Sequence, residues 1–366
     1  AQACRELERE YHVSPRRARL AVECARASLA EDRQLEEGQV SLYIGIPFCP
    51  TRCAYCSFVS ADVGRALKLV DPYVEALLEE VRRTGQVLEQ AGLRVRTLYV
   101  GGGTPTTLSA SQLDRLLAAA EAHLPLAGCR EMTVEAGRPD TITREKLEVL
   151  REHGIERISI NPQTMNGETL MRMGRTHTPE QIVQAFALAR EAGFEAINMD
   201  LIAGLPGEDA SDMEDTLRQV EEMHPDSLTV HALAIKRAAR YGQEGRKQDL
   251  HSEISQMIMS AADCAKRIGL QPYYLYRQKN IAGNFENVGY AELDKAGIYN
   301  ILIMEEKQTI LAAGAGASTK ILLKDPIRTD SGKEINLVRC ENVKNIMEYI
   351  DRVDEMIERK GEWLWR

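Results

Sequence analysis

Six short apolar runs alternate with helix-forming stretches along this chain, and no other feature constrains its fold as strongly. The apolar runs predict strands at 40–46, 95–100, 132–135, 157–160, 196–202 and 227–231. The intervening stretches predict helices at 72–90, 109–123, 144–152, 179–192 and 209–223. Strands that alternate with helices form a parallel sheet covered by those helices. The sequence therefore predicts an α/β fold, a partial (β/α)6 barrel of the TIM type.

Less regular segments flank these units on both sides. Residues 1–38 are rich in Arg, Glu, Ala and Leu and predict a helical N-terminal extension, which we interpret as the end of a longer domain. The barrel is expected at 39–240. Residues 241–366, with a helix predicted at 250–268, are expected to form an α+β extension that covers the substrate.

Composition excludes some classes of protein. The formal net charge of -9 argues against non-specific nucleic-acid binding, which needs a basic face. The chain has no apolar run of about 18 residues, the length that a membrane span requires, and it shows no signal-peptide pattern. We therefore expect a cytoplasmic protein that neither binds nucleic acid nor spans a membrane.

Three of the eight cysteines lie on one short loop directly after the first predicted strand. Cys49, Cys53 and Cys56 follow the pattern C-x3-C-x2-C. Thiolates suit zinc or iron–sulfur clusters, and three of them can hold three irons of a [4Fe–4S] cube while the fourth iron stays open for chemistry. The alternatives are three unligated cysteines, or a zinc site that a distant histidine completes.

A glycine run and several polar residues stand at the ends of the other predicted strands. Gly101-Gly102-Gly103-Thr104 follows the second strand, where glycines let the backbone approach a ligand closely. Glu135, Gln163, Asp200 and His231 end later strands, and Arg175 follows the fourth. Because the active sites of barrels form at the carboxyl ends of their strands, these residues predict one ligand pocket.

The assembled motifs resemble the radical S-adenosylmethionine (SAM) superfamily. Its signature is the C-x3-C-x2-C loop after the first strand, with an aromatic residue before the third cysteine and a glycine loop after the second strand. More narrowly, the chain resembles the oxygen-independent coproporphyrinogen III oxidase-like subfamily, most closely its coproporphyrinogen dehydrogenase branch in Firmicutes. The matching stretches are 43–49, 101–106, 133–136, 158–163, 174–175 and 200–207.

The resemblance implies a role for each matched residue. Cys49, Cys53 and Cys56 would be catalytic, as the ligands of a [4Fe–4S] cluster, and SAM would bind the open iron. The SAM-binding residues that it implies are Tyr43, Tyr55, Gly102, Gly103, Thr104, Glu135, Gln163, Arg175, Asp200, Ala234 and Ala317.

The resemblance also implies a reaction in anaerobic heme biosynthesis. A low-potential donor such as flavodoxin or ferredoxin would reduce the cluster, and SAM would be cleaved to methionine and a 5′-deoxyadenosyl radical. That radical would abstract a hydrogen atom from a propionate side chain of coproporphyrinogen III. Loss of CO₂ and an electron would leave a vinyl group, and two such steps give protoporphyrinogen IX.

The sequence departs from the family's pattern in one respect. The oxidases carry a fourth cysteine two residues beyond the third, and this chain has Phe58 there. The heme-chaperone branch also has an aromatic residue at that position, but its His-Asn motif is missing here. The alternatives are therefore a heme-binding chaperone of the same family or a radical SAM enzyme that acts on another tetrapyrrole.

An anionic tetrapyrrole would need cations beside an apolar wall. Cations follow the sixth strand and stand among the tyrosines of 273–276, and arginine pairs well with carboxylates. A histidine at the end of the sixth strand is a further candidate, as a proton donor or heme ligand, or for a structural hydrogen bond. The predicted substrate residues are His231, Lys236, Arg237, Arg240, Arg277 and Lys279.

Overall fold

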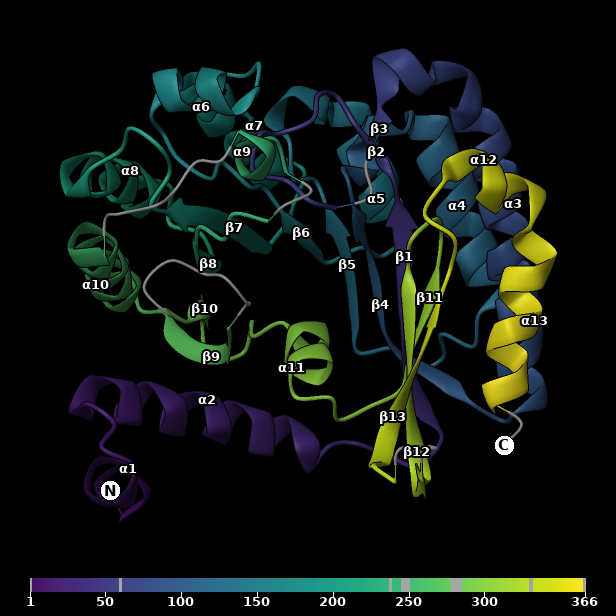
Figure 1. Ribbon diagram of the computed structural model, residues 1–366. Helices are drawn as coiled ribbons and strands as arrows, with labels where there is room; N and C mark the ends of the chain where they lie inside the picture. Colours follow the sequence, from purple (N-terminus) through teal and green to yellow (C-terminus); the bar gives the residue numbers. More distant parts are fainter. Residues whose placement is uncertain are drawn as a thin grey trace.

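The protein is an α/β structure built around one long sheet (Figure 1). The computed structural model describes residues 2–58, 61–236, 239–244, 251–277, 285–328 and 332–364. Six consecutive parallel strands form its centre, in the order β1-β4-β5-β6-β7-β8. They are β1 Gln39–Ile46, β4 Arg94–Gly102, β5 Glu131–Glu135, β6 Arg157–Ser159, β7 Ala196–Ala203 and β8 Ser227–Ala232. All six predicted strands are confirmed.

Helices connect these strands and cover the outer face of the sheet (Figure 1). They are α3 Val63–Gln90, α4 Ala110–His123, α5 Arg144–Glu152, α6 Gly167–Met173, α7 Pro179–Glu191, α8 Ala210–Met223 and α10 His251–Arg267. Short helical turns lie at η1 Pro105–Thr107, η2 Pro139–Thr141 and α9 Arg240–Gln243. None of the helices in the described ranges combines the length and apolar character that crossing a membrane requires.

Local capping explains where several helices begin. Ser109, Thr178 and Asp209 each accept a hydrogen bond from the backbone N–H three residues on and complete a capping box. The predicted start of the helix at residue 72 is wrong, because α3 begins at Val63, where the Asp62 side chain accepts from the Gly64 N–H. Pro72 therefore lies inside α3, where it removes one backbone donor without ending the helix.

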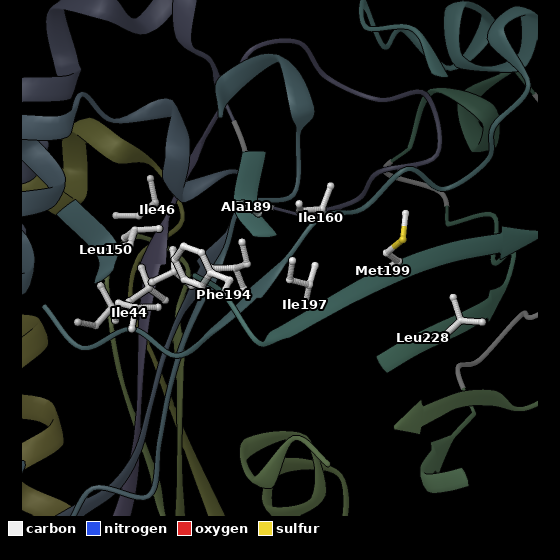
Figure 2. Packing of buried hydrophobic residues seen from close by; sticks show 14 of the residues in the cluster. Ile44, Ile46, Leu150, Ile160, Ala189, Phe194, Ile197, Met199 and Leu228 are labelled. Atoms are coloured by element: carbon white, nitrogen blue, oxygen red, sulfur yellow. The ribbon is translucent and has the colours of Figure 1, made fainter. Parts of the chain in front are cut away.

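The core lies between the parallel strands and these helices. Parallel strands with both faces covered are apolar along their whole length, and β1 and β7 each bury three of every four residues. Figure 2 shows part of this core, with Ile44 and Ile46 of β1, Ile197 and Met199 of β7 and Leu228 of β8. Leu150 of α5 and Phe194 contribute to the same cluster. The packing fixes the carboxyl ends of the strands relative to one another.

Residues beyond the barrel extend the same sheet at both of its edges. Beside β1, β11 Ile310–Ala313 pairs in parallel, and β12 Ser318–Arg328 and β13 Glu334–Glu341 follow in antiparallel order. Beside β8, β10 Asn287–Ala291 and β9 Gln271–Tyr276 add two antiparallel strands. The α+β extension predicted for the C-terminal part is thus hydrogen-bonded to the barrel itself.

The remaining helices close the open side and flank one edge of the sheet. The N-terminal helices α1 Gln2–Glu10 and α2 Pro15–Asp32 confirm the helical extension. Helix α2 contacts β9, and α11 Ile298–Met304 contacts both β9, at one edge of the sheet, and β4, in its centre (Figure 1). The last helices, α12 Ile346–Asp351 and α13 Val353–Leu364, pack on α3.

Candidate active site

The cysteine loop leaves the barrel at the carboxyl end of β1 and is anchored by its own backbone. The short strand β2 Phe48–Cys49 pairs with β3 Ala61–Asp62 and closes the loop. The Ala54 N–H donates to the Met173 carbonyl at 2.9 Å, and the Ala54 carbonyl accepts from the Tyr241 N–H at 3.1 Å. The Thr51 hydroxyl donates to the Gly174 carbonyl at 2.5 Å. Helices α6 and α9 therefore hold the loop in place.

A buried arginine supports the same loop from the end of β5. Arg138 donates from Nη1 to the Thr51 hydroxyl oxygen at 3.1 Å. Its other nitrogens form a bidentate pair with Asp140, at 3.0 and 2.9 Å. Burial opposes ionisation of Asp140, but His177 and Arg138 outweigh it and hold the pKa of that carboxyl well below its usual range. Arg138 was not predicted, although it lies only three residues after Glu135, the last residue of β5.

The three thiols are partly buried and form no disulfide. Burial raises the pKa of Cys49 to about 11, and it also raises the pKa of Cys56. Metal coordination would reverse this preference, because a coordinating thiol is deprotonated outright. Within the described ranges no three His, Cys, Asp or Glu side chains converge on a site for a single metal ion. A cubane does not need that convergence, since each of its cysteines binds a different iron.

The glycine loop packs directly against the cysteine loop. The Gly103 N–H donates to the Ile46 carbonyl at 2.8 Å, and the Thr104 N–H donates to the Phe48 carbonyl at 2.7 Å. The Thr104 hydroxyl lies 3.5 Å from Cys49 Sγ. A Cβ on Gly103 would lie 2.5 Å from the Phe48 carbonyl oxygen and 3.0 Å from Cys49 Sγ. Only glycine fits there, so the two predicted motifs form one cradle.

Glu135 lies next to this cradle, at the end of β5. The Tyr99 hydroxyl donates to Glu135 Oε1 at 2.6 Å. Burial raises the pKa of Glu135 to about 7, and the negative charge of Asp200 adds to the shift. The carboxyl group can therefore be neutral or ionised near neutral pH, according to the charge beside it.

Asp200 and His231 face each other from neighbouring strands. His231 Nε2 lies 3.9 Å from Asp200 Oδ2, and Asn198 Nδ2 donates to Asp200 Oδ1 at 2.7 Å. Burial opposes ionisation of Asp200, but these neighbours outweigh it and leave its pKa below the ordinary value. On its other side, His231 Nδ1 lies 3.2 Å from the Tyr276 hydroxyl. The histidine thus bridges an ionised carboxylate and a tyrosine.

Gln163 and Arg175 carry buried polar atoms that a ligand could satisfy. Gln163 has a φ of +69°. Its N–H donates to the Asp200 carbonyl of β7, and its carbonyl accepts from the Ile202 N–H of the same strand. Arg175 donates to the Asn161 carbonyl at 2.5 Å and to the Tyr55 hydroxyl at 3.3 Å. Gln163 Oε1, Arg175 Nε and Asn161 Oδ1 have no hydrogen-bond partner among the residues that the structure describes. Buried polar atoms are almost always paired, so this set fits a polar ligand such as SAM.

A stack of three tyrosines forms an aromatic wall beside Glu135. The Tyr99 and Tyr299 ring centroids are 4.5 Å apart, and Tyr43 lies 6.2 and 6.4 Å from them. Burial raises the pKa of all three phenols, so they stay neutral. Only Tyr43 was predicted. Tyr99 lies on a predicted strand but was given no role in the site, and Tyr299 belongs to α11, a helix that was not predicted.

The remaining predicted residues differ in their placement. Ala317 is buried in the loop after β11, close to Gly45 of β1, and Ala234 is half-buried just after β8. Lys236 and Arg277 are exposed. Arg240 donates to the Arg172 carbonyl at 3.1 Å and pairs with Glu244. Two further predicted cations, Arg237 and Lys279, lie outside the described residues.

Comparison with known sequences shows a radical SAM protein. The model of the radical SAM superfamily matches residues 43–220. The chain is 42% identical, over 368 residues, to the oxygen-independent coproporphyrinogen-III oxidase-like protein HemZ of Bacillus subtilis, covering 99% of this chain and 72% of that protein. It is 35% identical to the heme chaperone HemW of the same organism over 228 residues, 60% of this chain and 59% of that protein.

One solved structure supports the same assignment. Coproporphyrinogen III oxidase (HemN) from Escherichia coli, described as a radical SAM enzyme, superimposes with a TM-score of 0.68 at 25% identity. The match covers 91% of this chain and 73% of HemN. The resemblance and the fold predicted from the sequence are thus confirmed. An iron–sulfur centre and SAM are what unites this superfamily, in keeping with the cysteine loop and the polar cradle. The chain belongs to the radical SAM superfamily of enzymes, within the oxygen-independent coproporphyrinogen-III oxidase-like family.

Proposed function

We propose that this protein is a cytoplasmic oxidoreductase that uses a [4Fe–4S] cluster and SAM to decarboxylate propionate side chains of coproporphyrinogen III oxidatively. The observation that carries the proposal is the convergence of four features at the carboxyl ends of the central strands. Cys49 contacts the glycine loop, that loop adjoins Glu135, and Glu135 lies beside the tyrosine stack. The 42% identity to an oxidase-like protein over nearly the whole chain supports the same reaction class.

Each part of the cradle has a proposed task. Cys49, Cys53 and Cys56 would hold the cluster, and Gly102, Gly103 and Thr104 would hold the methionine part of SAM. When bound, the cluster and SAM supply the one-electron chemistry that removes a hydrogen atom from the substrate. The unpartnered Arg175 Nε would donate a hydrogen bond to SAM, and the unpartnered Gln163 Oε1 would accept one from it. Tyr55, which accepts from Arg175, would lie near its adenine ring.

The chain's own side chains would exclude water and orient the substrate. Tyr43, Tyr99 and Tyr299 form an aromatic wall that pyrrole rings of the substrate can pack against. His231 is within reach of Asp200 and Tyr276 and would hold or donate a proton there. Lys236 and Arg277, both exposed, would pair with propionate groups that extend outward.

An anaerobic assay tests the proposal. The reconstituted protein would be given dithionite, SAM and coproporphyrinogen III, and both vinyl products and methionine would be quantified. Vinyl product with matching release of methionine is expected. Methionine release with unchanged substrate would contradict the proposal and indicate a different tetrapyrrole substrate. Stoichiometric heme binding without any SAM cleavage would contradict it in favour of a heme chaperone.

A further inference from the structure

A concave site lies beside the cysteine loop, between the start of α3 and the end of α6. It is a cavity of about 960 Å³. Its lining residues come from the cysteine loop, the start of α3 and the end of α6: Thr51, Arg52, Ala61, Asp62, Arg65, Ala66, Leu69, Met171, Gly174, Arg175 and Thr176. Neither the tyrosine stack nor Glu135, Asp200 or His231 lines it. Arg175, a proposed SAM contact, is shared with the active site, but the cavity reaches the cysteine loop without the residues proposed to meet the substrate.

The cavity is cationic in a chain whose net charge is -9. Arg52 and Arg65 are exposed, and neither forms an ion pair with any residue that the structure describes. Among the described residues, Asp62 is the one acidic residue in the lining, and its carboxylate caps α3 through the Gly64 N–H. This cavity would therefore attract an acidic partner, whereas much of the remaining, negatively charged surface would repel it.

Apolar side chains accompany these arginines. Met171 lines the cavity with 70% of its surface exposed. Phe58, two residues after Cys56 on the same loop, is 67% exposed. An exposed Met beside these Arg residues, with an exposed Phe on the same loop outside the lining, matches the composition of protein interfaces, in which these types are enriched. A small molecule with several carboxylates would use the arginines but would leave the apolar side chains uncovered.

We infer that this surface docks an acidic protein that carries a single electron, a small flavin or iron–sulfur carrier. The inference rests on the proposed function, which requires a reductant. The carrier would be oxidised by one electron, and the centre held by the cysteine loop would be reduced by one. Thr51 and Arg52 belong to the loop between Cys49 and Cys53, so a partner in the cavity contacts the segment that holds the cluster.

Binding of a carrier tests the surface directly. The dissociation constant of an acidic flavodoxin for the cluster-loaded enzyme would be measured by calorimetry at low and high salt. Arg65→Glu is expected to weaken binding at least tenfold, Arg65→Lys to bind like the wild type, and added salt to weaken wild-type binding. Lys344→Glu, an exposed residue outside the cavity, makes the same change in charge and should alter binding less than twofold. Equal effects of Arg65→Glu and Lys344→Glu would overturn the inference.

Two reductants separate this inference from the proposed function. Arg65→Glu should cleave SAM about tenfold more slowly than the wild type when flavodoxin is the donor, and at the wild-type rate with dithionite. Equal slowing with both reductants would place the defect in the active site and overturn the docking surface. Competition between coproporphyrin and flavodoxin for the cavity would also overturn it, in favour of a site for small anions. If the wild type does not cleave SAM with dithionite, the proposed function is wrong. The calorimetric measurement of flavodoxin binding then tests the docking surface by itself.

Discussion

Lys360 of α13 and Glu80 of α3 form an ion pair that is almost completely shielded from water, with side-chain exposures of 4% and 0%. Glu80 also accepts from the Gly314 N–H at 2.7 Å and from the Tyr349 hydroxyl at 2.5 Å. Lys360 donates to the Ala312 carbonyl at 2.9 Å. The pair thus joins two helices to the loop that follows β11, the loop that contains Ala317.

Breaking this pair should destabilise the protein strongly. Lys360→Met leaves the Glu80 carboxylate buried without its cation. Removing one partner of a buried ion pair lowers the free energy of unfolding by about 3–5 kcal/mol. The midpoint of urea unfolding should fall accordingly. The double variant Glu80→Gln/Lys360→Met removes both charges and should recover part of the loss. Lys324→Met, which breaks an exposed pair with Glu37, should leave the midpoint unchanged. Equal midpoints for Lys360→Met and Lys324→Met would contradict the role of the buried pair.

Each cysteine of the loop should be needed for the cluster. Cys49→Ala, Cys53→Ala and Cys56→Ala are each expected to lose the brown absorbance and most of the bound iron after anaerobic reconstitution, because each thiolate holds one iron. Cys4→Ala is the matched control, since Cys4 lies in α1, away from the loop. If a loop variant keeps the iron content and spectrum of the wild type, the assignment of that ligand is wrong.

Gly103→Ala should disturb the cradle without a change in charge. The added Cβ would overlap the Phe48 carbonyl oxygen at 2.5 Å. Relief of that overlap moves the cysteine loop, so we expect a loss of about 1–3 kcal/mol in stability and reduced iron binding. Gly167→Ala is the control, because the nearest atom to its added Cβ is Pro179 Cδ at 3.8 Å. That variant should bind iron normally. A Gly103→Ala protein with wild-type iron content and SAM affinity would show that the close packing is not needed.

SAM affinity should depend on pH through Glu135. Its raised pKa of about 7 means that the carboxyl is mostly protonated below pH 7 and mostly ionised above it. SAM carries a positively charged sulfonium, so the ionised carboxylate attracts it more than the protonated form does. Equilibrium binding to the oxidised, cluster-loaded protein should therefore weaken about tenfold from pH 8 to pH 6, the ratio of ionised fractions at those values.

Two variants isolate that effect. Glu135→Gln cannot ionise, and its SAM affinity should be low and nearly flat over this range. Glu208 also has a pKa raised to about 7 by burial, but its carboxylate accepts from Thr164 at 2.6 Å and has no proposed contact with SAM. Glu208→Gln should keep the pH dependence of the wild type. If Glu208→Gln loses the pH dependence of SAM affinity and Glu135→Gln keeps it, the titrating group is Glu208 and not Glu135.

The central strands were predictable because of their surroundings. A strand covered on both faces is apolar almost throughout, so runs such as 40–46 and 196–202 stand out in the sequence. The added strands were harder to predict. β12 and β13 are largely exposed and alternate only weakly, and α6 has seven residues, too few to show a helical period.

The residues of the candidate site also divide into predictable and unpredictable ones. Motifs contiguous in sequence, the cysteine loop and the glycine loop, were recognisable from residue types and spacing. Tyr299 and Arg138 join the site through tertiary packing, one from α11 and one by reaching back to Thr51. Nothing in their local sequence distinguishes them from ordinary core and surface residues.

The added strands on both edges also determine the order in which this protein can fold. β1 emerges from the ribosome long before β11, yet β1 pairs with it over residues 41–44. Until residues 310–313 are synthesised, the strand that leads into the cysteine loop has an open edge, and β8 has another until β10 arrives. Open edges pair readily with other chains. A fragment that ends at residue 240 would expose both, so we expect it to aggregate, and the barrel becomes a stable unit only after its last strands are in place.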